Sequence, residues 1–298
     1  MKRQFIIFSY LLLVSGLAFS QSRIKYKYEF IGGIGPSGFL GDLGGSYGNG
    51  SHFIKDYNIL SSRFCLDGGV RYKLNQRFSV KGMLSFAMVS GSDALSKDAI
   101  RQNRNLNFRS PIVELSAQAE YYFFSEVSKN LYTIGGLKSR KKKKKLSGYI
   151  FAGVGTFYYS PAEKLNGVWY NVRKYHVEGQ GLPGGPKQFS NFNIALPIGI
   201  GFKEVINKKW SIGAEFGYRK TFTDYIDGVS HNYYDKTKLT QAYGPIAAAL
   251  ADPNLGRIPG ATNAGQERGN PKFKDSYMFL TITVGYKFAK QHRTRAKF

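Results

Sequence analysis

The side chains of this sequence that could transfer protons near neutral pH are four histidines, His52, His176, His231 and His292. A hydrolase would place one of them beside a serine or cysteine nucleophile and an orienting carboxylate. None of the four stands in such a pattern. Three fall in segments that we predict below to be loops, and the fourth lies in the C-terminal tail. We therefore expect neither an enzyme nor a catalytic residue.

Metal and nucleotide chemistry have no better support in the sequence. The chain has one cysteine, Cys65, no Cys/His cluster and no aspartate-rich loop with calcium-binding spacing. The stretch GIGPSG, residues 33–38, has the glycines of a phosphate-binding loop. It follows a predicted strand but opens no helix, so its context is wrong for a dinucleotide site. We expect no metal site and no cofactor.

The strongest charge feature is the stretch SRKKKKKL, residues 139–146. By itself such a run predicts a nucleic-acid patch, a nuclear address or contact with an anionic membrane surface. We consider it, together with its flanking basic residue, as a candidate docking surface, and the alternatives depend on where the run lies. The candidate residues are Lys138, Arg140, Lys141, Lys142, Lys143, Lys144 and Lys145.

The N-terminus decides the compartment. Met1-Lys2-Arg3 is followed by an apolar stretch and a small-residue exit at Ala18-Phe19-Ser20. This is the pattern of a secretory signal peptide, and the stretch is shorter than the roughly 20 apolar residues of a spanning helix. We predict a signal peptide over residues 1–20 and cleavage near Gln21. An exported chain excludes the nuclear address.

The composition indicates how an exported chain with a single cysteine is stabilised. A small secreted domain is usually held together by disulfides, and Cys65 has no partner. The chain is instead 15% aromatic, with 21 Tyr, 23 Phe and 35 Gly. Excess Tyr, Phe and Gly without helical hydropathy is typical of an outer-membrane β-barrel, whose aromatic girdles lie at the lipid interfaces.

The elements that would build such a barrel are segments with period-two alternation of apolar and polar residues. The clearest is 113–123, where Val113, Leu115 and Phe123 share one face while Glu114 and Glu120 lie on the other. We predict an all-β, eight-stranded antiparallel transmembrane β-barrel in contact with outer-membrane lipid. The eight predicted strands are 24–34, 63–74, 77–89, 113–123, 147–160, 192–203, 210–220 and 277–288.

The inward faces of these strands carry many charged residues. A barrel of eight strands is only wide enough for its own side chains to fill the interior, and charges buried there must pair or be solvated. We therefore interpret the inward charges as ion pairs of a filled lumen rather than as a pore or a catalytic site. The predicted lumen residues are Glu29, Arg63, Asp67, Arg71, Lys81, Glu114, Glu120, Glu215 and Arg219.

The lengths of the connections predict the orientation. Links near 75–76 and 204–208 are short, whereas those at 35–59, 90–111, 160–190 and 223–275 are long. Bacterial barrels have short periplasmic turns and long external loops. We therefore place the long loops outside the cell and both termini in the periplasm. The barrel domain is predicted over 21–290 and a basic periplasmic tail over 291–298.

One periplasmic link, 124–147, is too long for this rule, and it holds the lysine run. This link and residues 287–298 together carry a net charge of +12, out of +24 for the chain. Nucleic acid is not expected as a partner, because the aromatic residues alternate along strands and so face lipid. Two interpretations stay open: a solvated basic loop near inner-leaflet headgroups, or a docking surface for an acidic periplasmic partner.

Three stretches carry a family resemblance: FLGDLGG at 39–45, NRNLNFRSPIVELSAQAEYYF at 103–123 and ERGNPKFKDSYMF at 267–279. In these the sequence resembles the PorG-like outer-membrane β-barrels of Bacteroidetes, which are associated with the type IX secretion system. Ser276 stands where the family pattern has Trp. The positions that carry the resemblance are Gly41, Asp42, Leu43, Arg104, Leu106, Phe108, Arg109, Ser110, Arg268, Gly269, Asn270, Asp275 and Tyr277.

The resemblance implies an eight-stranded barrel that anchors a periplasmic ring of lipoprotein and partner subunits. Our hypothesis is therefore a non-enzymatic outer-membrane component of type IX secretion. The alternative is a surface-binding or adhesion barrel that uses its long external loops. An enzyme acting on lipid A ranks third.

Overall fold

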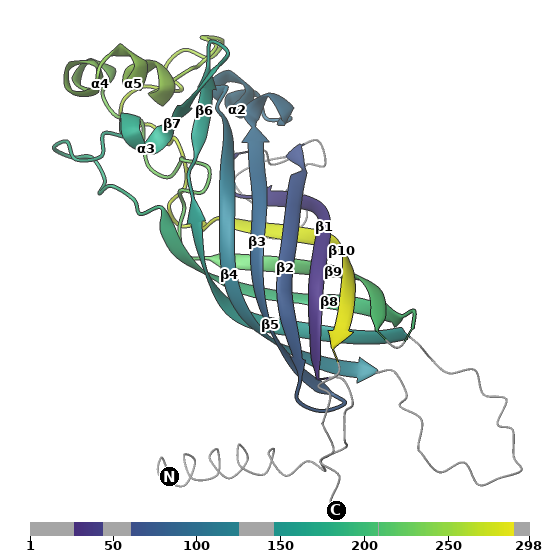
Figure 1. Cartoon of the computed structure of the whole chain (residues 1–298). Helices are drawn as coiled ribbons and strands as arrows, with labels where there is room; N and C mark the ends of the chain where they lie inside the picture. The colour runs from purple at the N-terminus through teal and green to yellow at the C-terminus, as the bar shows by residue number, and fades with distance from the viewer. Residues whose placement is uncertain (1–26, 44–60, 125–145, 208, 289–298) are drawn as a thin grey trace, which may run out of the picture.

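The computed structural model describes residues 27–43, 61–124, 146–207 and 209–288. Its main body is a ring of eight antiparallel strands in the order β3-β2-β1-β10-β9-β8-β5-β4, closed by pairing of β3 with β4 (Figure 1). The strands are β1 Tyr28–Leu40, β2 Arg63–Lys73, β3 Phe78–Ser92, β4 Asn107–Phe124, β5 Leu146–Tyr159, β8 Phe192–Val205, β9 Trp210–Thr221 and β10 Ser276–Phe288.

The predicted closed eight-stranded barrel is confirmed, and each predicted segment coincides with one strand. The largest difference is β4, which begins at Asn107 rather than at 113 and so extends beyond the end of β5. Pairing of β1 with β10 places Tyr28 opposite Phe288, so both ends of the barrel chain lie at one end of the cylinder. We call this the turn end and the opposite one the loop end. The predicted signal peptide 1–20, the tail 291–298 and the docking residues 138–145 lie outside the described residues.

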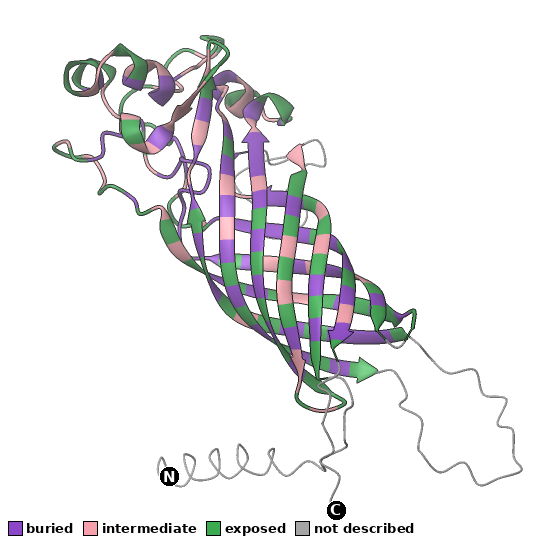
Figure 2. Ribbon diagram, viewed as in Figure 1, coloured by how far each residue is buried: buried purple, intermediate pink, exposed green. Residues whose placement is uncertain are grey.

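The outer wall of the barrel is apolar. Exposed and buried residues alternate along the strands in Figure 2, as period-two patterning requires. Phe192, Ile282 and Leu115 each leave more than 60% of their surface accessible. So continuous an apolar surface is unstable in water and fits a hydrocarbon surrounding. Among the described residues, no helix is long and apolar enough to cross a membrane.

The interior has two layers. Charged side chains fill the half near the turn end, as described below. Towards the loop end the inward side chains are mostly aromatic, with Phe108, Phe157 and Tyr277 each at most 1% exposed. Rings of Phe157 and Tyr277 pack edge to face at 5.4 Å between centroids. This aromatic layer continues into the loops as one hydrophobic core.

The long connections at the loop end fold into an ordered cap, which we define as residues 93–106, 160–191 and 222–275 (Figure 1). Its helices pack around a small core of Val172, Val177, Leu239, Leu250 and Ala251. The elements of the cap are η3 Asp93–Leu95, α2 Ala99–Arg104, β6 Ala162–Leu165, β7 Val168–Asn171, α3 Val172–Tyr175, α4 Lys236–Tyr243 and α5 Pro245–Ala251.

Local sequence explains why the cap forms these elements. The Asp235 side chain accepts a hydrogen bond from the backbone N–H of Lys238 and so caps α4. Pro245 begins α5, whose sequence PIAAALA is rich in strong helix formers. Asn166 and Gly167, both with positive φ, form the tight turn between β6 and β7.

Candidate functional site

The half of the barrel interior near the turn end is filled by what we call the lumen network: Glu29, Arg71, Lys81, Glu120, Lys203 and Glu215. Arg71, 2% exposed, lies at its centre. Its guanidinium donates to Glu29 at 2.8 Å and to Glu120 at 2.7 Å. It also lies 3.2 Å from Glu215. Three cations thus face three carboxylates.

The two lysines complete these pairs. Lys81 Nζ lies 2.5 Å from Glu215 and 3.5 Å from Glu120. Lys203 Nζ donates to Glu29 at 2.9 Å. Tyr149 adds a hydroxyl that donates to Glu215. Each carboxylate therefore has at least one cationic partner, as a buried charge requires.

Of the nine predicted lumen residues, the structure brings seven into ion pairs. Glu114 pairs with Arg219 at 3.4 Å, nearer the loop end than the lumen network. Asp67 and Arg63 take part in none of the ion pairs formed by the described residues. Arg63 departs from the prediction because β2 begins at this residue and its side chain is exposed at the loop end. Lys203 was not predicted, although the outward Phe202 beside it indicated its inward position.

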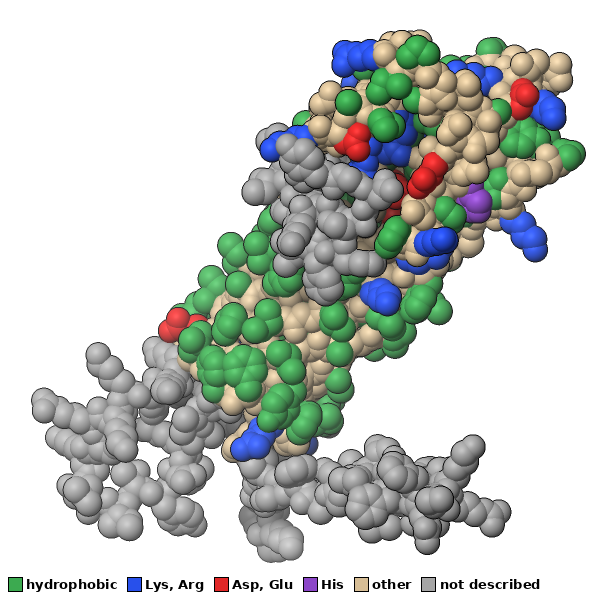
Figure 3. All heavy atoms as spheres, turned by 180° about the vertical axis from the view of Figure 1, so that it is seen from behind, with side chains coloured by type: hydrophobic (Ala, Val, Ile, Leu, Met, Phe, Trp, Pro, Cys, Tyr) green, Lys and Arg blue, Asp and Glu red, His purple; other side chains and the backbone are tan. Residues whose placement is uncertain are grey.

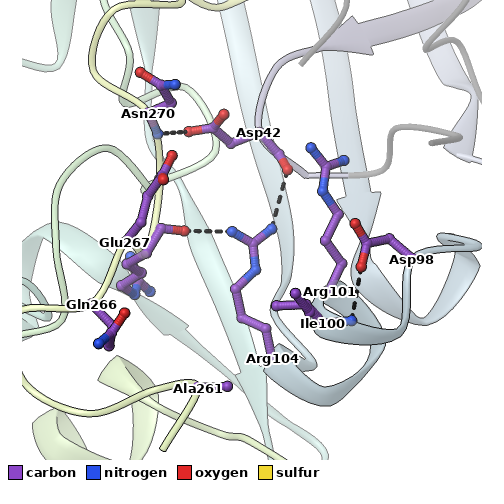
Figure 4. Close-up of a pocket in the computed structure, with 11 residues that line it drawn as sticks. Asp42, Asp98, Ile100, Arg101, Arg104, Ala261, Gln266, Glu267 and Asn270 are labelled. Carbon is purple, nitrogen blue, oxygen red and sulfur yellow. Dashed lines mark hydrogen bonds between the residues drawn. The ribbon is translucent and has the colours of Figure 1, made fainter. Parts of the chain in front are cut away.

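Residues of the three family-resemblance stretches, far apart in the sequence, meet at the mouth of the barrel (Figure 4). Arg104 Nε donates to the carboxylate of Asp93 at 2.7 Å. Its Nη2 donates to the carbonyl of Asp42 at 3.1 Å, and its Nη1 to the carbonyl of Arg268. The carboxylate of Asp42 in turn accepts the backbone N–H of Asn270 at 2.7 Å. One arginine thus fastens the end of β1 and the segment before β10 to α2.

Arg268 is buried to 1% exposure and ties the parts of the cap together. Its guanidinium donates to the carbonyl of Ala251, at the end of α5, at 3.1 Å. It also donates to the carbonyl of Gly228 at 3.1 Å and to Glu178 at 3.0 Å. Its Nη2 lies 3.8 Å from Glu163, and burial raises the pKa of that carboxyl to about 8. Arg268 therefore joins three segments of the cap.

The other resemblance residues serve packing. Leu43, Leu106, Phe108 and Tyr277 belong to the hydrophobic core. Gly41 and Gly269 leave room for the carboxylates of Asp275 and Asp42, which a Cβ at either glycine would strike. The hydroxyl of Ser110 accepts the backbone N–H of Ser160 at 3.2 Å. Arg109 alone points outward, where it stacks on the ring of Trp169.

Four aspartates come together at the mouth, Asp42, Asp224, Asp227 and Asp275, which we call the mouth cluster. All four are buried. Burial raises the pKa of Asp42 to about 6 and of Asp224 to about 8, and it raises the pKa of the other two as well. The neighbouring aspartates add to the shift, since like charges cannot all ionise in one buried place.

The oxygens of the mouth cluster are incompletely satisfied. Asp275 accepts the backbone N–H of Ile226 at 2.8 Å, and Asp227 that of Val229 at 2.9 Å. Both oxygens of Asp224 and one of Asp227 have no hydrogen-bond partner. Among the described residues, no three Asp, Glu, His or Cys side chains are placed to hold a metal ion. The carboxyl groups are therefore suited to hold protons.

A cavity of about 310 Å³ opens beside Asp42 at the mouth (Figure 4). Arg101 and Glu267 bring opposite charges to its wall, and the exposed Ile100 adds an apolar surface. The two histidines within the described residues serve the cap: His176 stacks on Tyr243 at 4.4 Å, and His231 contacts the Tyr225 hydroxyl at 3.0 Å. The cavity can thus take a small polar ligand, and neither of these histidines has a nucleophile among its recorded partners.

Comparisons with known proteins place the architecture among bacterial barrels. Neisserial surface protein A shares 9% identity, with a TM-score of 0.38, over 88% of this chain and 97% of its own. Ail of Yersinia pestis shares 11% identity, with a TM-score of 0.38, over 89% of this chain and 100% of its own. Outer membrane protein W of E. coli shares 13% identity, with a TM-score of 0.35, over 89% and 100%.

No curated protein sequence matches this chain. A family model described as a domain of unknown function, DUF6089, matches residues 4–247. The match begins before β1 and runs through β9 into α5, so it takes in most of the barrel and much of the cap. The chain belongs to the DUF6089 family.

Proposed function

We propose that this chain is a non-enzymatic anchor in the outer membrane, and that it holds a periplasmic ring complex of the type IX secretion system beneath that membrane. The observation that carries the proposal is the filled interior. The lumen network occupies the half near the turn end, and aromatic residues occupy the half near the loop end. A small barrel filled in this way acts through its surfaces rather than by transport.

The apolar wall supports the membrane location. Lipid-facing residues such as Ile150, Leu196 and Ile282 are exposed on different strands around the ring. Short turns join β2 to β3 and β8 to β9 at the same end as Tyr28 and Phe288. Since short turns are periplasmic in bacterial barrels, this arrangement supports periplasmic termini and an external cap.

The type IX assignment is finer and rests on two supports. The first is the resemblance to PorG-like barrels, whose shared positions here converge to fasten the loops onto the barrel. The second is the lysine run. β4 ends and β5 begins at the turn end, so the link that carries Lys141–Lys145 starts and finishes on the side we assign to the periplasm. A basic segment there suits an acidic ring subunit.

The test is co-purification from the native host after mild detergent extraction. The full chain should recover periplasmic ring subunits, and replacement of Lys141–Lys145 by Ser should reduce that recovery strongly. The matched control replaces five exposed basic residues of the cap by Ser and should recover the subunits fully. The control residues are Lys164, Lys174, Lys238, Arg257 and Lys272.

Two results would count against the proposal. If the unmodified chain recovers no ring subunits, the anchor role is wrong. If the subunits are recovered equally with and without Lys141–Lys145, the anchor role stands but the lysine run is not its docking surface.

A second candidate, a surface-binding or adhesion barrel, is favoured by the ordered cap and its cavity of about 310 Å³. Replacing α4 and α5, residues 236–251, by a short linker should then abolish binding of a surface ligand while secretion continues. Loss of secretion with this variant would instead support a role for the cap in the anchor.

A further inference from the structure

The cap separates its charges by sign between interior and surface. The carboxylates of Asp93, Glu163, Glu178, Asp224, Asp227, Asp252 and Asp275 are all buried. Among the described residues of the cap, Glu267 is the one carboxylate classed as fully exposed, and Asp98 and Asp235 are half-buried. The exposed basic residues of the cap are Lys97, Lys164, Lys174, Lys187, Lys236, Lys238, Arg257, Lys272 and Lys274. The outer surface of the cap is therefore cationic.

Some basic side chains lie where strands leave the apolar wall, and we call Arg109, Lys187, Lys220 and Lys274 the basic collar. Lys220 points outward from β9, because its neighbours Arg219 and Thr221 are buried. Arg109 points outward from β4 in the same way. Lys187 and Lys274 shortly precede β8 and β10. The collar thus follows one arc of the barrel, from β10 through β9 and β8 to β4.

Figure 3 shows this arc, since it views the molecule from behind. Lys and Arg side chains gather there between the apolar wall and the cap. Lys220 shares its strand face with Tyr218 and with Phe222, which is 54% exposed. A cation flanked by lipid-facing aromatic residues lies at headgroup depth, where its apolar stem stays in the membrane and its charge reaches the polar layer.

We propose that the basic collar binds phosphorylated lipid headgroups of the leaflet that surrounds the loop end. Phosphate suits these residues because guanidinium and ammonium groups donate charge-assisted hydrogen bonds to its oxygens. The position favours a lipid over a soluble polyanion, since Lys220 and Arg109 extend from strand faces that also contact lipid. This inference requires the barrel to lie in a membrane, but it is independent of the secretion partner.

The chain contains a reporter for this site. It has two tryptophans, Trp169 and Trp210. The ring of Trp169 lies 4.2 Å from the guanidinium carbon of Arg109, whereas Trp210 lies at the turn end. Replacement Trp210→Phe leaves Trp169 as the single reporter. A phosphate that draws Arg109 away from the ring will change the Trp169 fluorescence.

The experiment titrates the full chain with Trp210→Phe, in neutral detergent micelles, with diphosphorylated lipid A, chemically dephosphorylated lipid A and phosphatidylcholine. We expect a saturable change with the phosphorylated lipid alone. A triple variant, Lys187→Gln, Lys220→Gln and Lys274→Gln, keeps the reporter and should weaken binding at least about tenfold. The matched control removes three exposed basic residues at the turn end, Lys27→Gln, Arg77→Gln and Lys209→Gln, and should bind as the parent does.

Three outcomes would overturn the proposal. Equal responses to phosphorylated and dephosphorylated lipid A would mean that phosphate is not recognised. Equal weakening in the two triple variants would mean that only net charge matters. An equal response to a soluble sulfated polysaccharide would assign the collar to soluble polyanions instead. Faster gel migration of unheated samples checks that every variant is folded.

Discussion

The lumen network and the mouth cluster bury carboxylates in opposite ways. In the lumen, Glu29, Glu120 and Glu215 each lie within 3.5 Å of a lysine or arginine nitrogen. At the mouth, by contrast, both oxygens of Asp224 lack a hydrogen-bond partner, and the nearby Arg104 pairs with Asp93. The first region is neutralised by counter-charges and the second by protons.

This difference separates the two tasks of the molecule. Paired charges on different strands hold the barrel wall in register at any pH where the carboxylates are ionised. Shared protons hold the cap only while the solution supplies them. We therefore expect the barrel and the cap to respond to different perturbations, and the predictions below test that separation from the largest expected effect to the smallest.

The largest effect is expected from Arg71→Met. This change leaves Glu29 and Glu120 buried with fewer cationic partners, and breaking a buried ion pair costs about 3–5 kcal/mol of stability. Urea unfolding of the barrel in lipid vesicles measures the loss, and Arg77→Met in an exposed turn is the control. A variant as stable as the control would show that the lumen network does not hold the barrel.

Arg268→Met should act on the cap alone. The change leaves Glu178 and two backbone carbonyls without their donor, at a cost of about 2–4 kcal/mol to the closed cap. Hydrogen exchange should accelerate across α5 and residues 222–234 while the barrel strands stay protected. The control is Arg257→Met, which is exposed. Equal loss of protection in the strands would mean that cap and barrel form one cooperative unit.

The third prediction uses pH to separate the regions. Burial raises the pKa of Asp42 to about 6 and of Asp224 to about 8, so the folded cap retains protons that the unfolded loops release near pH 4. Stability from these groups is therefore complete at low pH and is lost as the pH rises through 6 and then 8.

Between pH 5 and pH 9, hydrogen exchange of the cap, corrected for intrinsic rates, should accelerate at least about tenfold, which corresponds to one pKa unit. The variant Asp224→Asn with Asp227→Asn carries no charge to release and should flatten the dependence. Strand amides in the barrel serve as the internal control. An unchanged pH dependence in the double variant would remove the mouth cluster as its cause.

The two regions were not equally accessible to prediction from sequence. Alternation with a period of two predicts which face each strand residue takes, so Arg71 and Glu120 could be placed in the lumen from their neighbours alone. Lys203 follows the same rule beside Phe202. Arg63 fails because the rule ends where the strand begins.

The mouth could not be derived because its contacts are distant in sequence. Asp42 and Asn270 are 228 residues apart, and Arg268 and Glu178 are 90 apart. Aspartates in glycine-rich stretches such as FLGDLGG are typical of exposed turns, and only the fold buries Asp42. Local signals for α4 and α5 were present in Asp235 and Pro245, but they do not say where a helix packs.

The smallest expected effect lies at the junction of the two regions. The Tyr277 hydroxyl, fully buried, donates to Glu114 at 2.8 Å, and Arg219 is the other partner of that carboxylate. Tyr277→Phe should cost about 1–2 kcal/mol, because it removes a hydrogen bond to a charged group that keeps one ion pair. Tyr218→Phe, which removes the half-buried hydroxyl that donates to Ser276 at 2.7 Å, is the matched control and should cost less. If Tyr277→Phe changes strand protection but not cap protection, the junction belongs to the barrel. The opposite pattern would move the boundary between the regions down to the lumen network.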